Sequence, residues 1–247
     1  MRALLLVLAL VAPLAVAQEE AVRLDPAPID PRDLASLQSG ARTFVNYCLN
    51  CHSAGMMRYV KLEEIGLTEQ QIKDNLLFTG DKIGDLMNVA LTKKDAKDWL
   101  AAVPPDLSVI ARAKGADWLY TYLRSFYRDT ESATGWNNMV EDRVAMPNVL
   151  WTLSGQQTLV PQKFKSLEQA GKDGDRYVLK TIKTEVPGKL SQLEYDVLVR
   201  DLVNFMTWMS EPNQLERKQT GYVVMLVLLV LLVFAYLLYK EFWKDVH

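Results

Sequence analysis

The pattern of apolar and polar positions along the chain predicts a mainly helical protein. Apolar residues recur at helical spacing over 41–48, with Gly40 at a point where another helix can come close. Capping-box patterns at 68–71 and 191–194 predict a short helix and a long amphipathic helix that ends before Pro212. A further helix is expected over about 107–127, loosened at Gly115. Only 154–160 and 177–186 are expected to be strands.

The two ends of the chain carry apolar runs of a different kind. Residues 1–17 combine Arg2, an apolar run and small residues at the end, a pattern typical of a cleaved secretory signal peptide. The stretch 219–239 has no charged residue, is long enough to cross a bilayer and is flanked by aromatic residues. We therefore expect four parts: a signal peptide (1–17), an exported domain (18–219), a transmembrane anchor (220–239) and a cytoplasmic tail (240–247).

Charge adds little to this picture. The formal net charge is −2 and the charged residues are interspersed, so no nucleic-acid partner is expected. Two basic residues lie on each side of the span, so they do not decide its orientation. The signal peptide does: the domain is expected in the periplasm of a bacterium, as a single-pass protein of the inner membrane with a cytoplasmic C-terminus.

The chemistry is concentrated in the only two cysteines of the chain. Cys48 and Cys51 stand in a C-x-x-C-H motif that ends in His52. At this spacing both thiols can bond to the vinyl groups of one haem while the adjacent imidazole reaches the iron. The motif predicts a single covalently attached haem c, with Cys48 and Cys51 as its anchors and His52 as a ligand of the iron.

Three other interpretations of the cysteines were weighed. A structural zinc site needs four ligands, and the only other histidine is His247, on the far side of the membrane. A thioredoxin-like pair needs a βαβ context, whereas a helix is expected before Cys48. A plain disulfide across two residues closes too small a loop to stabilise much. Haem attachment fits the motif better than any of these.

The sixth ligand of the iron is expected to be a methionine. His52 is the only histidine of the exported domain, so a second imidazole is ruled out. Methionine is the usual alternative, and it raises the reduction potential. We expect Met146, because Pro147 favours an extended loop that can present the sulfur, and Met139 is the second candidate. The other exported methionines lie too close behind His52 or are better explained by packing or exposure: Met56, Met57, Met87, Met206 and Met209.

The order of motifs resembles the cytochrome c1 family of bacterial type, the haem-bearing subunit of ubiquinol–cytochrome c oxidoreductase. The resemblance covers essentially the whole mature chain. It rests on the haem motif at 48–52, Pro-Pro-Asp-Leu-Ser at 104–108, Ala-Arg-Ala-Lys at 111–114, Met146-Pro147 and the C-terminal anchor. It implies a mostly α, class I cytochrome c-like haem domain with long loop insertions, plus one C-terminal transmembrane helix.

The resemblance also implies site residues. In the family the Pro-Pro segment packs beside the haem, which points to Pro105, and a basic residue shortly after it holds a haem propionate. Arg112 and Lys114 are the candidates here. The family often has Arg at the position of Lys114, and Lys lacks the planar two-pronged fork of a guanidinium.

The implied function is electron transfer without bond chemistry in this chain. The expected partners are a cytochrome b subunit, a Rieske iron–sulfur protein that delivers the electron and a soluble c-type cytochrome that removes it, within a dimeric complex. One alternative is a cytochrome subunit of a terminal oxidase or nitric oxide reductase, whose members typically carry an uncleaved N-terminal anchor. A haem enzyme or gas sensor with an open sixth position is a different class, and the Met146 loop argues against it. A domain that only holds a disulfide and serves assembly is the third, and it predicts no visible absorption.

Overall fold

The computed structural model describes residues 23–163, 172–173 and 176–244, so the expected signal peptide lies outside the described residues. The α-helices are α2 (Leu34–Thr43), α3 (Glu69–Asn75), α4 (Lys93–Leu100), α5 (Ile110–Lys114), α6 (Ala116–Arg124), α7 (Trp151–Ser154), α8 (Gln192–Ser210) and α9 (Gln214–Phe242). A π-helical turn, η2 (Phe44–Cys48), and a 3₁₀ helix, η3 (Tyr59–Ile65), follow α2. The strands are β1 (Ala54–Arg58), β2 (Leu86–Met87), β3 (Phe126–Arg128), β4 (Trp136–Asn138), β5 (Gly155–Lys163), β6 (Lys172–Asp173) and β7 (Arg176–Pro187).

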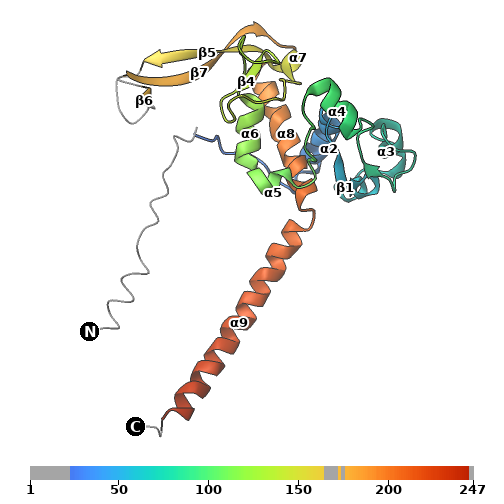
Figure 1. The fold of residues 1–247 in the computed structure, drawn as a ribbon. Helices are drawn as coiled ribbons and strands as arrows, with labels where there is room; N and C mark the ends of the chain where they lie inside the picture. Colours follow the sequence, from blue (N-terminus) through green and yellow to red (C-terminus); the bar gives the residue numbers. More distant parts are fainter. Residues whose placement is uncertain (1–22, 164–171, 174–175, 245–247) are drawn as a thin grey trace.

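The fold is mostly α, as the sequence predicts, and its centre is the packing of α2 and α6 against α8 (Figure 1). Gly40 lies where α2 meets α8: a Cβ there would stand 2.0 Å from the carbonyl oxygen of Asp201. One turn later Phe44 packs on Phe205, with ring centroids 5.6 Å apart. The close approach expected at Gly40 is therefore confirmed, and it connects the helix before the haem motif to the helix before the anchor.

Buried polar groups also join these two helices. Ser36 donates to Asp201 at 2.8 Å, and the side-chain amide of Asn204 donates to Ser36 at 3.0 Å and to the carbonyl of Asp30 at 2.8 Å. A buried network with these hydrogen bonds favours one register between α2 and α8 over its neighbours.

Both predicted capping boxes are present. Thr68 accepts from the backbone of Gln71 while the Gln71 side chain accepts from the backbone of Thr68, at the start of α3. Ser191 and Glu194 form the same pair at the start of α8, which ends at Ser210, just before Pro212. Local side-chain chemistry was enough to place these helix starts.

The single helix expected over 107–127 is wrong in detail. Gly115, at φ +94° and ψ 153°, breaks it into α5 and α6, because this conformation is outside the helical region and open essentially to glycine. Residues before Ile110 are drawn out of the helix by a backbone bond from Leu107 to Ser53. Phe126 leaves it at the other end and pairs with Asn138 in the β3–β4 ladder.

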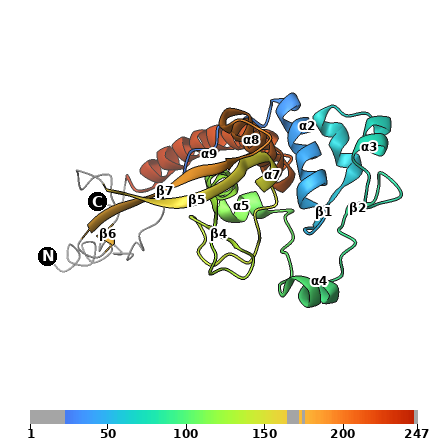
Figure 2. The ribbon, with the colours of Figure 1, turned by 90° about the horizontal axis from the view of Figure 1, so that it is seen from above.

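The two predicted strands are confirmed as β5 and β7, an antiparallel pair that projects from the helices (Figure 1). The expectation that they were the only strands is wrong. The pairs β1–β2 and β3–β4, and β6 beside β7, are too short to give an alternating pattern. Helix α4 was not predicted either; it lies at the end of two long connections, away from the helical centre (Figure 2).

Helix α9 is the candidate membrane span. Its 29 residues correspond to about 43 Å at 1.5 Å per residue, more than the roughly 30 Å of a hydrocarbon core. None of its residues is buried, and it extends away from the rest of the protein (Figure 1). A long apolar helix without protein contacts around it is suited to lipid. It contains the stretch 220–239 and continues beyond it at both ends.

Candidate haem site

The haem motif begins in the widened last turn of the α2 segment. Ala41, Phe44 and Val45 bury one side of this segment in the core. At η2 the backbone N–H of Leu49 donates to the carbonyl of Phe44, five residues earlier, at 3.0 Å. Such single π-turns are frequent at functional sites. This one places the two cysteines at the end of a segment whose other side is fixed.

Cys48 and Cys51 occupy one tight turn. The N–H groups of Cys51 and His52 both donate to the carbonyl of Cys48, at 3.1 and 2.9 Å. Both thiols are free and half-buried. Burial, reinforced by Cys51, raises the pKa of the Cys48 thiol to about 12. A thiol held protonated is a poor redox nucleophile, which speaks against a thioredoxin-like pair.

The imidazole of His52 is held by a backbone carbonyl. Its Nδ1 lies 2.7 Å from the carbonyl oxygen of Pro105, and the side chain is buried. A carbonyl can only accept, so Nδ1 carries the proton and Nε2 keeps its lone pair. Burial lowers the pKa of His52, which also favours the neutral ring. A neutral imidazole whose other nitrogen donates to a carbonyl is the usual arrangement of a metal-binding histidine.

The segment that supplies this carbonyl is tied to the chain after the motif. The sequence indicates Pro105 here, but the next three residues make the hydrogen bonds that fix the segment. Asp106 and Ser108 use their side chains, and Leu107 uses its backbone. The hydrogen bonds are Leu107 N to Ser53 O at 2.8 Å, Gly55 N to Asp106 Oδ2 at 2.7 Å and Met56 N to Ser108 Oγ at 3.0 Å.

Asp106 is the central member of this group. Its other oxygen accepts from the N–H of Ser108 at 2.8 Å. Burial opposes the carboxylate, but the hydrogen bonds from Ser108 and Gly55 outweigh it, so the pKa of Asp106 lies below its ordinary value. The sequence signal that could have found this residue is the polar pair around Leu107 in the 104–108 segment.

Met146 contacts Tyr122 on α6. It is half-buried, and its sulfur accepts a hydrogen bond from the hydroxyl of Tyr122 at 3.7 Å. The alternative, Met139, is also half-buried, and its N–H donates to the carbonyl of Ser125 at 3.2 Å. Met57, Met87, Met206 and Met209 are buried in the hydrophobic core, and Met56 is exposed. The structure thus leaves the same two candidates, and the assignment of Met146 stays a prediction.

The two basic candidates, Arg112 and Lys114, both lie on α5 but have different neighbours. Lys114 lies with its ammonium 4.7 Å from the ring centre of Trp118, which stacks on Tyr122, so it belongs to the Met146 side of the site. Arg112 is exposed on α5. Its charge acts on Glu211, whose pKa is lowered mainly by Arg217. Of the two, Lys114 is better placed for a group bound near Met146.

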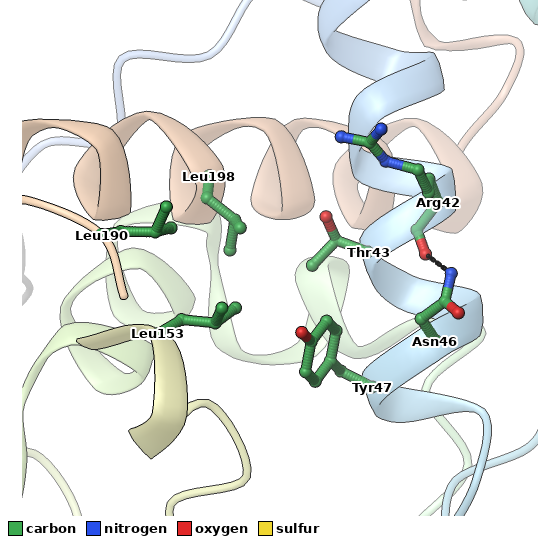
Figure 3. Close-up of a pocket in the computed structure, with 7 residues that line it drawn as sticks. All are labelled: Arg42, Thr43, Asn46, Tyr47, Leu153, Leu190 and Leu198. Atoms are coloured by element: carbon green, nitrogen blue, oxygen red, sulfur yellow. Dashed lines mark hydrogen bonds between the residues drawn. The ribbon is translucent and has the colours of Figure 1, made fainter. Parts of the chain in front are cut away.

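A cavity of about 500 Å³ opens one turn before the motif. Leu153, Leu190 and Leu198 face Thr43 and Tyr47 across it (Figure 3). Its lining includes neither the motif residues 48–52 nor Met146. This cavity is therefore walled by residues for which the sequence suggested no functional role.

The donor set fits a covalently bound haem. Two thiols in one turn can form the thioether links, and His52 offers a neutral Nε2 on the same turn. Met146 offers a soft sulfur that is half-shielded from water. A C-x-x-C-H turn with an oriented imidazole, in a mostly α fold that ends in a candidate membrane helix, defines an anchored c-type cytochrome.

Comparison with known proteins makes this more specific. The model of the Cytochrome C1 family matches residues 190–246. The chain is 49% identical to the ammonia monooxygenase gamma subunit of Nitrosomonas europaea, over 92% of this chain and 90% of that protein. It is 46% identical to cytochrome c1 of Allochromatium vinosum, over 91% and 90%, and 26% identical to that of Rhodospirillum rubrum, over 87% and 83%. The protein belongs to the cytochrome c1 family, which implies a covalently bound haem c and a role in electron transfer.

Proposed function

We propose that this protein is the haem subunit of a quinol–cytochrome c oxidoreductase. It takes one electron from a Rieske iron–sulfur protein through a single His/Met-ligated haem c and passes it to a soluble c-type cytochrome. The observation that carries the proposal is the 2.7 Å bond between His52 Nδ1 and the carbonyl of Pro105, which leaves Nε2 as a ligand. Membership of the cytochrome c1 family supports the rest.

In this proposal each residue of the candidate haem site has a defined role. Cys48 and Cys51 would hold the haem by thioether bonds, and His52 and Met146 would bind its iron. When bound, the haem supplies the one-electron couple. Pro105 keeps the imidazole in one orientation, and Lys114 would supply the positive charge for a propionate. The hydrogen bonds between 53–56 and 106–108 hold the turn still, so little rearranges when the charge of the site changes.

Family membership supports the proposed partners, and helix α9 supports the proposed membrane location. A cytochrome b/c1 of Bradyrhizobium diazoefficiens is 23% identical to this chain, which covers 34% of it, and its name joins the two cytochromes. This name supports a cytochrome b subunit as partner. We propose that the complex is dimeric, as the family resemblance implies. We propose that the haem domain lies in the periplasm after removal of residues 1–17, with the tail in the cytoplasm. The length and apolar character of α9 support its place in the inner membrane.

A second candidate comes from the relative named ammonia monooxygenase gamma subunit. The 49% identity is compatible with a place for this chain in a monooxygenase complex. There it would supply electrons to the monooxygenase, whereas in the first proposal it passes them to a soluble cytochrome. The subunit of a terminal oxidase or nitric oxide reductase is the third possibility. These candidates share the haem and differ in the complex that surrounds it.

The test of the ligands is a reduced-minus-oxidised spectrum of membranes that contain the intact protein or its Met146→Ala variant, with Met139→Ala as the matched control. We expect Met146→Ala alone to lose the weak thioether–iron band of the oxidised form and to lower the potential strongly. Loss of the band in Met139→Ala would move the ligand there, and absence of any haem spectrum would overturn the proposal. Purification of the intact protein by an affinity tag then identifies the complex: cytochrome b and a Rieske protein support the proposal, monooxygenase or oxidase subunits the alternatives.

A further inference from the structure

Tyr122 brings a hydroxyl group against the sulfur of Met146. The O–H donates to Sδ over 3.7 Å, a distance suited to a sulfur acceptor. Tyr122 is buried, with 8% of its surface exposed. Little water can therefore compete with the sulfur for this donor, which strengthens a bond that is weak in water.

The ring that carries the hydroxyl is fixed from both sides. Trp118 stacks on it, with centroids 4.6 Å apart and planes 13° apart, and Phe126 meets its edge at 5.0 Å and 71°. Asn138 donates to the backbone carbonyl of Tyr122 at 2.8 Å. The hydroxyl thus points at the sulfur because packing directs it there, with little rotamer freedom left to lose.

A thioether sulfur has two lone pairs, so it can bind a metal with one and accept a hydrogen bond with the other. We infer that Tyr122 is a positioning residue for Met146: it orients the sulfur and tunes how strongly the sulfur donates to the iron. This inference rests on the proposed ligation by Met146. Hydrogen bonds to a ligand are an established means by which a protein adjusts a redox centre.

The direction of the effect follows from the charge of the iron. A hydrogen bond draws electron density from the sulfur and makes it a poorer donor. Ferric iron depends on that donation more than ferrous iron does. The Tyr122 hydroxyl therefore favours the reduced state, and its removal lowers the reduction potential.

The experiment is a redox titration of the full chain in native membranes, comparing Tyr122→Phe with wild type. Tyr120→Phe is the matched control, because Tyr120 is equally buried on the same helix but packs on Arg124, on another face. We expect Tyr122→Phe to lower the equilibrium constant for reduction about fivefold, or about 40 mV at 59 mV per decade. The thioether–iron band should shift or weaken in this variant alone.

The outcomes separate this inference from the proposed function. If Met146→Ala removes the thioether band while Tyr122→Phe matches Tyr120→Phe in potential and spectrum, the ligand is right and the role of Tyr122 is wrong. If Met146→Ala keeps the band, the premise itself fails. Should Tyr122→Phe take up no haem, Trp118→Leu frees the ring but keeps the hydroxyl, and an unchanged potential there would overturn the inference.

Discussion

Asp106 uses one carboxylate to hold two backbone N–H groups beside the haem motif, those of Gly55 and Ser108. Replacing it by alanine leaves both donors without this acceptor and loosens the segment that presents the Pro105 carbonyl. Because Asp106 is exposed and water can replace part of these bonds, we expect Asp106→Ala to lower the free energy of unfolding by about 0.5–1.5 kcal/mol. Urea unfolding of the intact protein in detergent measures this, with Asp98→Ala on the exposed side of α4 as the control.

The loss of stability in Asp106→Ala should depend on pH, because the wild-type side chain is a titratable carboxylate. Because folding lowers the pKa of Asp106, its contribution is fully present above the ordinary value of 3.8 and is lost as the pH falls through the lower folded value. The difference between Asp106→Ala and wild type should therefore shrink in acid. A difference that is absent at neutral pH, or equal to that of Asp98→Ala, would contradict this role.

At this scale the sequence indicates candidate residues for binding a cofactor but not the residues that support them. The spacing of Cys48, Cys51 and His52 is itself the chemical signal, so the motif could be recognised without a structure. The role of Asp106 depends on Gly55, and the role of Tyr122 depends on Met146, across 51 and 24 residues of chain. No local pattern encodes such pairs.

Among the elements, the contact of α2 with α8 depends on the missing side chain of Gly40. A Cβ there would stand 2.0 Å from Asp201 O and 2.6 Å from the Cβ of Phe205, so the helices must separate to admit it. We expect Gly40→Ala to cost about 1–3 kcal/mol of stability, against the small gain in helix propensity. Thermal unfolding followed by circular dichroism measures it.

Gly84→Ala is the control for this change, because nothing lies within 4 Å of the Cβ it would add. Equal stability of the two variants would mean that α2 and α8 can move apart freely. The haem spectrum is a second readout. Because α2 leads directly to the motif, a displacement of α2 should broaden the haem bands or reduce the amount of attached haem.

Element boundaries were predictable where the signal is local. The capping boxes at Thr68 and Ser191 are read directly from neighbouring side chains, and both helices begin there. At Gly115 a loosened helix was expected, but the complete break depends on the backbone angles of that one residue. The strand β1 was not predictable, because it depends on the pairing of Ala54 with Met87, 33 positions away. Long-range pairing overrides weak local preference.

For the whole molecule, α9 is separable from the packed domain, because none of its residues is buried. We expect a chain that stops after Asn213 to leave the membrane fraction while keeping the spectrum of the full protein, since the core residues all precede that point. Alkaline carbonate extraction of membranes, followed by haem staining, measures the distribution. Full-length protein is the control, and a truncated chain that resists extraction would mean that the domain holds the bilayer by another surface.

The joint between α8 and α9 has a mechanical consequence. Only residues 211–213 separate the two helices, and three residues reach at most about 11 Å. Since α8 packs on α2 and the joint is short, the domain that carries the haem motif stays near the start of α9. With α9 in a bilayer, a redox partner must therefore dock at a height above the lipid that this short joint sets.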